Sequence, residues 1–352
     1  MKILQIGLGN FGKNHLRAWA KLGLLADLYL AERQRDRWKE AEGFGLTREQ
    51  TSEDPHDFLD QAAVVDIVTP TDSHHHLCCE ALKSGKDVFV EKPMTMNSKE
   101  AEEIVALTRK TGRLLQVGFG FRYHPISQYT KEAVASGKLG KIRYLSGSFM
   151  GFKRPRTDVG VTHTDGIHFL DLFQWFLDEF PSDVYAVTRD HFGRGLEDTS
   201  IVLLNYPNGS LAKVESGYIQ PGKWEDKVVP NARTTKEIFI VGTEKTIEAD
   251  YETGMLTVHD VHFEKKEPTW IPAFGETFSP SLEAPTSIDL VARELSDFLD
   301  AVKTRREPQA NAFSSGFTLA LLIEAIYRSA EMHQPQRLDL SSLALRSPQT
   351  IP

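Results

Sequence analysis

A glycine-rich turn near the first residue is the feature that most restricts how this chain can fold. The turn follows the apolar run Ile3–Gly7 and opens a helical pattern that we predict over Asn10–Leu22. The first glycine permits a tight turn, the second admits a pyrophosphate against the backbone, and the third lets helix and strand pack closely. The helix N-terminus then stabilises the anion. We therefore predict a dinucleotide site that contains Gly7, Gly9, Asn10, Phe11 and Gly12.

Strand and helix patterns alternate through the first 121 residues. We predict strands at Ile3–Gly7, Ala26–Ala31, Val64–Val68, Asp87–Val90 and Leu114–Val117, and helices at Asn10–Leu22, Arg35–Phe44, His74–Ser84 and Ser98–Thr111, with Ser98 as the last helix's N-cap. This alternation is typical of a parallel sheet with helices on both faces. The fold class is therefore α/β, with a doubly wound Rossmann domain over residues 1–121 that binds the dinucleotide.

The pattern changes after residue 121, where strands follow one another without intervening helices. We predict strands near Ile142–Phe149, Val184–His191, Thr199–Tyr206, Leu211–Tyr218, Lys236–Val241, Thr246–Asp250 and Leu256–Phe263, and helices at Pro125–Ser136, Asp165–Leu177, Ile288–Lys303 and Phe313–His333. Such runs indicate a C-terminal α+β domain on a largely antiparallel open sheet, over residues 122–340. Residues 264–286, rich in proline and aromatics, are expected to be irregular, and 341–352 to form a tail.

Composition excludes several classes of protein. The 352 residues are 40% hydrophobic, enough for two ordinary domains, and the formal net charge of −8 argues against a nucleic-acid partner. No apolar run approaches the roughly 20 residues that span a bilayer. The two cysteines, Cys78 and Cys79, are neighbours in one predicted helix and poorly placed for a disulfide. We expect a cytoplasmic protein.

The choice of cofactor depends on Glu32, which ends the second predicted strand. A carboxylate there accepts hydrogen bonds from the adenosine ribose hydroxyls, which favours NAD. Arg33 follows at once and could instead hold a 2′-phosphate, so NADP stays possible.

A lysine stands where the predicted strand Asp87–Val90 ends, in the sequence Glu91-Lys92-Pro93. The carboxyl ends of strands in such a sheet border the ligand crevice, so the Lys92 ammonium can hold a hydroxyl oxygen and help to move its proton. Behind a dinucleotide turn, Lys92 is a candidate catalytic residue beside the nicotinamide.

A second polar cluster lies in the first long helix after residue 150. Asp165 and His168 are three residues apart and share a helix face. A carboxylate beside an imidazole orients the ring, and such a histidine can take a proton from a substrate hydroxyl. Taken alone, an ordinary polar pair explains these residues as well.

Together these motifs resemble the family named for glucose–fructose oxidoreductase, inositol dehydrogenase and MocA. The resemblance rests on the glycine turn, on Thr69-Pro70-Thr71 with His74, on Gly85-Lys86-Asp87-Val88 leading into Glu91-Lys92-Pro93, on Arg122-Tyr123-His124-Pro125, on Gly166-Ile167-His168-Phe169-Leu170-Asp171 and on Val241-Gly242-Thr243. It implies a dehydrogenase or reductase that acts on a secondary alcohol of a sugar, cyclitol or nucleotide sugar. It also implies a homodimer or homotetramer that forms through the C-terminal sheet.

The resemblance assigns roles to residues. Lys92 and His168 would flank the carbon being oxidised, and Arg122 and Tyr123 would contact the substrate. The remaining expected cofactor contacts are Thr69, Pro70, Thr71, His74 and Glu91. Many relatives carry an aspartate four residues before the histidine, where this chain has Thr164, so either Thr164 or Asp165 completes the site.

Other features leave alternatives open. Arg154 or Arg156 could bind an anionic group of the substrate, although a solvated charge run is at least as good an explanation. The run His74-His75-His76 does not predict a metal site, because rings at adjacent helical positions point in different directions. Two rival functions are an NAD-dependent glycosidase that oxidises its substrate transiently, and a dinucleotide-binding sensor without catalysis.

Overall fold

The chain divides into two compact units, each described here by itself. The computed structural model describes residues 1–340 apart from 228 and 230. Unit 1 comprises Met1–Gly120 and Thr286–Leu321, and unit 2 comprises Phe121–Pro285 and the described residues from Leu322 onward. Residues 286–321, which we had assigned to the second domain, therefore group with the first. The expected tail over 341–352 lies outside the described residues.

Unit 1 is built on a parallel sheet, as the alternating pattern predicted. Among the described residues the sheet has six strands in the order β3-β2-β1-β4-β5-β6. The strands are β1 (Ile3–Ile6), β2 (Leu28–Ala31), β3 (Thr51–Ser52), β4 (Val64–Ile67), β5 (Asp87–Glu91) and β6 (Leu115–Gly118). The helices are α1 (Gly12–Lys21), α2 (Trp38–Gly43), α3 (His56–Leu59), α4 (His74–Lys83), α5 (Ser98–Thr111) and α8 (Ser287–Thr304).

Strand order reverses between β1 and β4, because the chain adds β2 and β3 on one side of β1 and β4 to β6 on the other. All residues of β1, β4 and β5 are buried, as expected for central parallel strands covered on both faces. Ligands of doubly wound sheets bind outside the carboxyl ends of the strands at such a reversal. The topology thus defines where a dinucleotide would bind.

Helix α8 completes the core of unit 1. Its residues Leu295 and Phe298 are fully buried in one apolar cluster with Ile3, Leu16 and Trp19. The Phe298 ring also meets Phe89 of β5 edge-on, with 5.8 Å between centroids. A helix far along the sequence therefore covers the first strands of the chain.

Unit 2 is built on a mixed, largely antiparallel sheet. In the part that the structure describes, the strands of this sheet have the order β15-β14-β13-β12-β7-β10-β9-β8-β16, and β11 pairs with β12. Only the β7–β10 pair among these is parallel. The strands are β7 (Tyr144–Phe152), β8 (Asp183–Arg189), β9 (Thr199–Asn205), β10 (Leu211–Gly217), β11 (Trp224–Glu225), β12 (Arg233–Val241), β13 (Thr246–Asp250), β14 (Met255–Lys266), β15 (Thr269–Phe278) and β16 (Gln336–Arg337).

Helices cover one face of this sheet. They are α6 (Pro125–Ala135), α7 (Ile167–Leu177) and α9 (Thr318–Met332), whose residues up to Leu321 group with unit 1. Helix α7 lies against β7, where Gly147 makes room for the Phe169 ring because a Cβ there would be 2.8 Å from its Cγ. The other face is open: along β9 every second residue is exposed, including Ile201 and Leu203.

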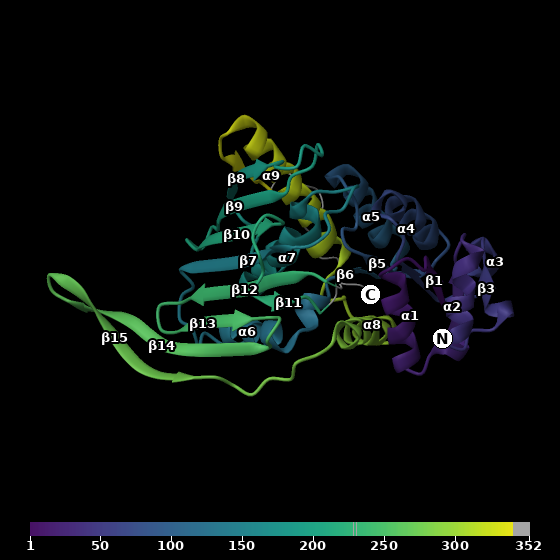
Figure 1. The fold of residues 1–352 in the computed structure, drawn as a ribbon, viewed down its shortest axis with the longest axis horizontal. Helices are drawn as coiled ribbons and strands as arrows, with labels where there is room; N and C mark the ends of the chain where they lie inside the picture. The colour runs from purple at the N-terminus through teal and green to yellow at the C-terminus, as the bar shows by residue number, and fades with distance from the viewer. Residues whose placement is uncertain (228, 230, 341–352) are drawn as a thin grey trace. The chain divides into compact units, whose positions relative to one another are not determined.

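The prediction that residues 264–286 are irregular was wrong over most of its length. Strands β14 and β15 continue to Lys266 and Phe278 as one long hairpin, which extends past the rest of the sheet in Figure 1. Pro272 lies within β15, and the described residues place this strand at the sheet's edge, where a missing N–H is tolerated. A proline-rich sequence therefore does not exclude an edge strand.

Several helix starts differ from those expected. Helix α1 begins at Gly12 rather than Asn10, and the N-cap of α5 is Asn97, which accepts a hydrogen bond from the Glu100 N–H. A π-helical turn, Thr162–Gly166, precedes α7. Strands β3, β11 and β16 and helix α3 escaped prediction because each is very short. No helix of the described residues is long and apolar enough to cross a membrane.

Candidate active site

The glycine turn connects β1 to α1 at the strand reversal. Gly7 has φ +101°, a left-handed conformation, and a Cβ there would be 2.7 Å from the Val68 carbonyl oxygen beyond β4. A Cβ on Gly12 would be 2.5 Å from the Gly7 oxygen. Two glycines are thus required by the protein's own packing, which brings the loops after β1 and β4 into contact.

Gly9 differs from the other two glycines, because a Cβ there would meet no protein atom within 4 Å. Protein packing therefore does not explain its lack of a side chain, whereas close approach of a ligand would. The N-terminus of α1 beside it has no acidic residue in the first turn, and its N-cap Phe11 offers no side-chain acceptor. These features fit the pyrophosphate of a dinucleotide, which would meet the positive end of the helix. Asn10 is exposed on the same turn.

Glu32 lies directly after β2 and is buried. Its Oε2 accepts a hydrogen bond from the Leu8 N–H of the glycine turn at 2.7 Å, and its Oε1 accepts one from the Gln34 N–H at 2.9 Å. Arg37 lies 3.3 Å from the same carboxylate, whereas Arg33 is exposed. The carboxylate therefore fixes the glycine turn, and its place after β2 is the one where a carboxylate could accept hydrogen bonds from a ribose diol.

The loop after β4 lies on the other side of the reversal. Thr69 is half-buried and accepts a hydrogen bond from Ser73, Pro70 is exposed, and Thr71 begins a short 3₁₀ turn. The ring nitrogens of the buried His74 lie 2.9 Å from the carbonyl oxygens of Thr69 and Pro93. Burial lowers the pKa of His74. His74 therefore joins two loops of the site.

Lys92 stands immediately after β5, the strand next to β4. Its backbone N–H donates to Oε2 of Glu91 at 3.1 Å, and the Lys92–Pro93 peptide is cis. Glu91 is buried, and its other oxygen lies 3.1 Å from Nε2 of His15. The side chain of Glu91, predicted as a cofactor contact, thus fixes the backbone that carries Lys92.

His168 lies in the first turn of α7, in unit 2. Its ring stacks on Phe121 with 4.7 Å between centroids, and on Phe149 of β7 with 6.2 Å. The histidine is half-buried, so its ring is held by aromatic neighbours yet keeps exposed surface. An imidazole held in this way can exchange a proton with a substrate hydroxyl.

Asp165, expected beside His168, points its carboxylate at Lys153. The Nζ of Lys153 donates to Oδ1 at 2.6 Å and lies 4.4 Å from the centre of the Phe149 ring. The π-helical turn explains the direction of the Asp165 carboxylate. In this turn the Ile167 N–H donates to the Thr162 carbonyl oxygen, five residues back. A turn with i→i+5 bonds holds more residues than an α-helical turn, so a residue three before His168 no longer shares its face.

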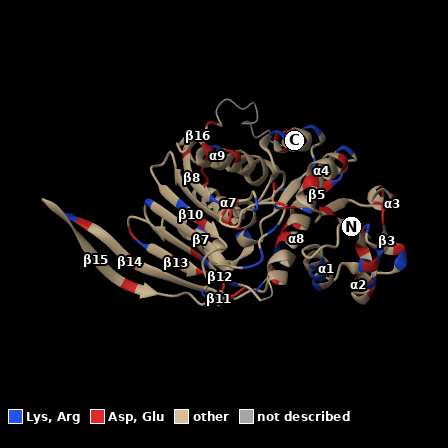
Figure 2. Ribbon diagram, turned by 45° about the horizontal axis from the view of Figure 1, so that its top comes forward, with Lys and Arg blue, Asp and Glu red and all other residues tan. Residues whose placement is uncertain are grey.

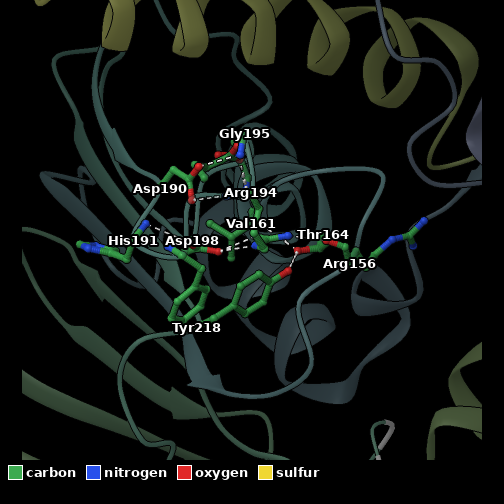
Figure 3. A network of polar contacts seen from close by, with 12 residues as sticks. Arg156, Val161, Thr164, Asp190, His191, Arg194, Gly195, Asp198 and Tyr218 are labelled. Carbon is green, nitrogen blue, oxygen red and sulfur yellow. Dashed lines mark hydrogen bonds and ion pairs between the residues drawn. The ribbon is translucent and has the colours of Figure 1, made fainter.

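Thr164 contacts Tyr218 through their hydroxyl oxygens, 2.7 Å apart (Figure 3). Burial, together with the charge of Asp165, raises the pKa of Tyr218, which therefore stays protonated. In the same network Arg194 donates to Oδ1 of the buried Asp198, and also to the backbone oxygen of Arg156. These contacts fix the segment that leads into α7.

The arginines and the tyrosine that we expected to bind substrate have other surroundings. Arg122 is 2% exposed, and its guanidinium donates two hydrogen bonds of 2.7 Å to Asp171. Tyr123 is also buried. Arg156 forms a bidentate pair with Asp158, and Arg154 is exposed. The pairing of Arg122 gives it a structural role in unit 2.

Sequence reasoning did not select Lys153, Phe149 or Tyr218. A signal for two of them was present, because Lys153 follows β7 directly and is four positions after Phe149, and residues an even number of positions apart in extended chain point to one side. Tyr218 lies directly after β10, and only the parallel pairing of β10 with β7 brings it near. His15 was also missed, since nothing local distinguishes it from other helix residues.

A glycine turn at a strand reversal, a carboxylate after β2 and a lysine after β5 define a dinucleotide-binding oxidoreductase domain. The sequence agrees: residues 1–119 match the model of the oxidoreductase family with an NAD-binding Rossmann fold, and residues 127–248 match the GFO/IDH/MocA C-terminal domain. The chain belongs to the GFO/IDH/MocA oxidoreductase family, which confirms the resemblance and the α/β fold class.

Relatives cover nearly the whole chain. UDP-N-acetylglucosamine 3-dehydrogenase of Acidithiobacillus ferrooxidans is 30% identical over 302 residues, which are 86% of this chain and 88% of the relative. D-apiose dehydrogenase of Paraburkholderia graminis is 24% identical, over 97% and 90% of the two chains. A levoglucosan dehydrogenase solved with NADH and levoglucosan shares the fold, with a TM-score of 0.80 at 20% identity, over 96% of this chain and 99% of that one.

Proposed function

We propose that this protein is an NAD-dependent dehydrogenase that oxidises a secondary alcohol of a sugar or cyclitol, or reduces the corresponding ketone. The placement of Lys92 carries the proposal: it follows β5 directly, at the carboxyl edge of the sheet where the glycine turn lies. The names of similar proteins, which include dehydrogenases of apiose, inositol and a UDP-sugar, support this substrate class.

The bound NAD would accept hydride from the carbinol carbon. Lys92 would bind the reacting oxygen with its ammonium and share the hydroxyl proton, and His168 would act as general acid/base on the same alcohol. We propose that Asp165 acts through Lys153, since its carboxylate is paired with that ammonium. Thr164 would orient substrate hydroxyls together with Tyr218.

We propose NAD rather than NADP as the physiological cofactor. A buried carboxylate at Glu32 would repel a 2′-phosphate, and Arg37, the cation next to it, is already paired with that carboxylate. Arg33, which could have held the phosphate, is exposed and separate from this pair.

The ion pairs of the basic side chains before α7 bear on the charge of the substrate. Arg156 is paired with Asp158 and Lys153 with Asp165, so neither offers a free positive charge. We therefore propose an uncharged polyhydroxylated ring at the reacting end, with Arg154 as the remaining candidate for an anionic group. Arg154→Ala would raise KM only for a sugar acid or nucleotide sugar, and an unchanged KM for such a substrate would exclude the arginine.

We further propose a homodimer or homotetramer in the cytoplasm. The open sheet face of unit 2 carries exposed apolar side chains from β9, β10 and β12, namely Ile201, Leu203, Leu211 and Phe239. Leu203 and Ile201 pair with Lys213 and Glu215 of β10, so this face combines apolar and charged side chains, as protein interfaces do (Figure 2). Cys78 and Cys79 are both free and buried, which suits a reducing compartment.

The test is a panel of sugars, cyclitols, sugar acids and nucleotide sugars, followed by NADH absorbance with NAD⁺ and with NADP⁺. One NADH per substrate consumed supports a dehydrogenase, whereas turnover without net NADH indicates the glycosidase alternative. Lys92→Ala should lower kcat by about 10²–10⁴-fold with little change in the Kd of NAD⁺. Lys83→Ala, which changes an exposed lysine at the end of α4, is the matched control. Full activity of Lys92→Ala would refute the mechanism.

A further inference from the structure

Four ionisable side chains meet in the interior of unit 1, and the proposed mechanism uses none of them directly. They are His15 of α1, Asp66 of β4, Glu91 of β5 and Glu294 of α8. Three are at most 1% exposed, and Glu91 is 8% exposed. Burying charged groups costs several kcal/mol unless they are paired, so such a cluster at the edge of a site demands an explanation.

His15 lies between two carboxylates. Its Nδ1 is 3.0 Å from Oδ2 of Asp66, and its Nε2 is 3.1 Å from Oε1 of Glu91. Carboxylates accept hydrogen bonds, so the ring fits best with a proton on each nitrogen. Burial alone would lower the pKa of His15, but the charges and hydrogen bonds of Asp66 and Glu91 raise it to about 10. His15 is therefore an imidazolium at neutral pH.

Glu91 uses both of its oxygens. Oε1 accepts from His15, while Oε2 accepts from the backbone N–H of Lys92 at 3.1 Å. Gly118 of β6 lies against the same carboxylate, where a Cβ would collide with Oε1. The ladder between β5 and β6 ends at the Glu91–Gly118 pair, so the first N–H beyond it is held by this side chain instead.

The cluster also contains one carboxyl group in a different state. Burial, and then the charge of Glu91, raise the pKa of Glu294 well above its usual range, which favours the protonated form of this carboxyl group. The remaining charges are the imidazolium and two carboxylates, and Trp19 donates a further hydrogen bond to Asp66 at 2.9 Å. The net charge of the cluster that holds the Lys92 backbone therefore depends on His15.

We propose that His15 is a positioning residue of the active site. By bridging Asp66 and Glu91 it holds the Glu91 carboxylate on the Lys92 backbone. Its positive charge also influences the pH at which the Lys92 ammonium loses its proton. His74 holds the other side of this segment through the Pro93 carbonyl oxygen. The inference rests on the proposed role of Lys92, but the contacts that support it are independent of any substrate.

The experiment measures the titration of Lys92 itself in the full-length protein. Wild type and variants are labelled with trace acetic anhydride over a pH series, and the modified Lys92 peptide is quantified by mass spectrometry. His15→Gln removes a positive charge, so the midpoint for Lys92 should rise by roughly one pH unit. Glu91→Gln removes a negative charge and should lower the midpoint by a similar amount. A residue that only fills space would not produce opposite shifts.

His56→Gln is the matched control. His56 also bridges an aspartate and a glutamate, Asp54 and Glu80, but on the exposed surface of the same unit. It should leave the Lys92 midpoint within about 0.2 pH units of wild type. Once the panel has identified a substrate, His15→Gln should lower kcat at least about tenfold with KM and the Kd of NAD⁺ within about threefold.

The outcomes separate this inference from the function on which it rests. Opposite shifts in folded His15→Gln and Glu91→Gln support the positioning role. An unchanged midpoint in folded His15→Gln overturns it, even where Lys92→Ala is inactive. If His15→Gln does not fold, a midpoint that stays constant or rises in Glu91→Gln overturns it. Full activity of Lys92→Ala refutes the catalytic proposal alone, because the labelling result does not depend on turnover.

Discussion

Replacing Asp171 by asparagine should strongly destabilise unit 2. The carboxylate receives hydrogen bonds of 2.7 Å from Nε and from Nη2 of Arg122, and the two side chains are 1% and 2% exposed. Asparagine keeps the shape of the side chain but leaves the guanidinium charge buried without its counter-ion. The variant therefore isolates the electrostatic part of the interaction.

The size of the effect follows from burial. Breaking one side of a buried ion pair costs about 3–5 kcal/mol, because the remaining charge stays in a medium of low polarity. For a domain of ~150–250 residues this corresponds to a loss of roughly 6–20 °C in Tm. Differential scanning calorimetry and urea unfolding of the purified protein would measure the change.

Two comparisons make the result decisive. Glu132→Gln breaks the exposed pair with Lys138, whose atoms are 3.5 Å apart, and should change stability by less than about 0.5 kcal/mol. The double variant Arg122→Met with Asp171→Leu removes both charges and should recover most of the stability. A loss below about 1 kcal/mol for Asp171→Asn would refute the reasoning. A folded double variant with a much higher KM would restore Arg122 as a substrate residue.

Two further predictions concern unit 1. Gly9→Ala should leave Tm nearly unchanged yet weaken NAD⁺ binding about tenfold or more in calorimetry. Gly12→Ala should instead lower Tm, because its Cβ would clash with the Gly7 oxygen. Equal Kd values for Gly9→Ala and wild type would contradict the role of Gly9. Glu294→Gln should be more stable than wild type by a larger margin at pH 8 than at pH 5. Burial raises the pKa of Glu294 in the folded protein, so the folded state binds this proton more tightly than the unfolded chain does. Wild-type stability therefore falls as pH rises, and glutamine removes that decline. A Tm difference between variant and wild type that stays constant over this pH range would exclude a buried, protonated Glu294.

The fold of unit 1 could be predicted from local sequence, because its central strands are short, mostly apolar runs and the turn between β1 and α1 is rich in glycine. The hairpin of β14 and β15 could not. Its sequence lacks clean alternation, and Pro272 argues against a strand unless the strand lies at an edge. Whether a strand is at an edge is decided by distant pairing, which local sequence does not report.

In the site, too, local patterns could be predicted and contacts between distant residues could not. Lys92 and the glycine turn were found because each has a local pattern with a physical reason. The pairings between distant residues were not found: His15 meets Glu91 across 76 positions and Arg122 meets Asp171 across 49. The Asp165–Lys153 contact required knowledge of a π-helical turn, which changes the spacing rule that holds for an α-helix.

Unit 1 is discontinuous along the chain, and this has a consequence for biosynthesis. Its strands β1 to β6 leave the ribosome first, but the apolar surface that receives Leu295 and Phe298 stays uncovered until α8 emerges, more than 160 residues later. At ~5–20 residues per second this interval lasts roughly 10–30 s. A nascent or truncated chain that ends near residue 121 should thus expose the apolar residues that α8 covers, to which chaperones bind. Production of the nucleotide-binding part alone would need α8 supplied, for instance by circular permutation.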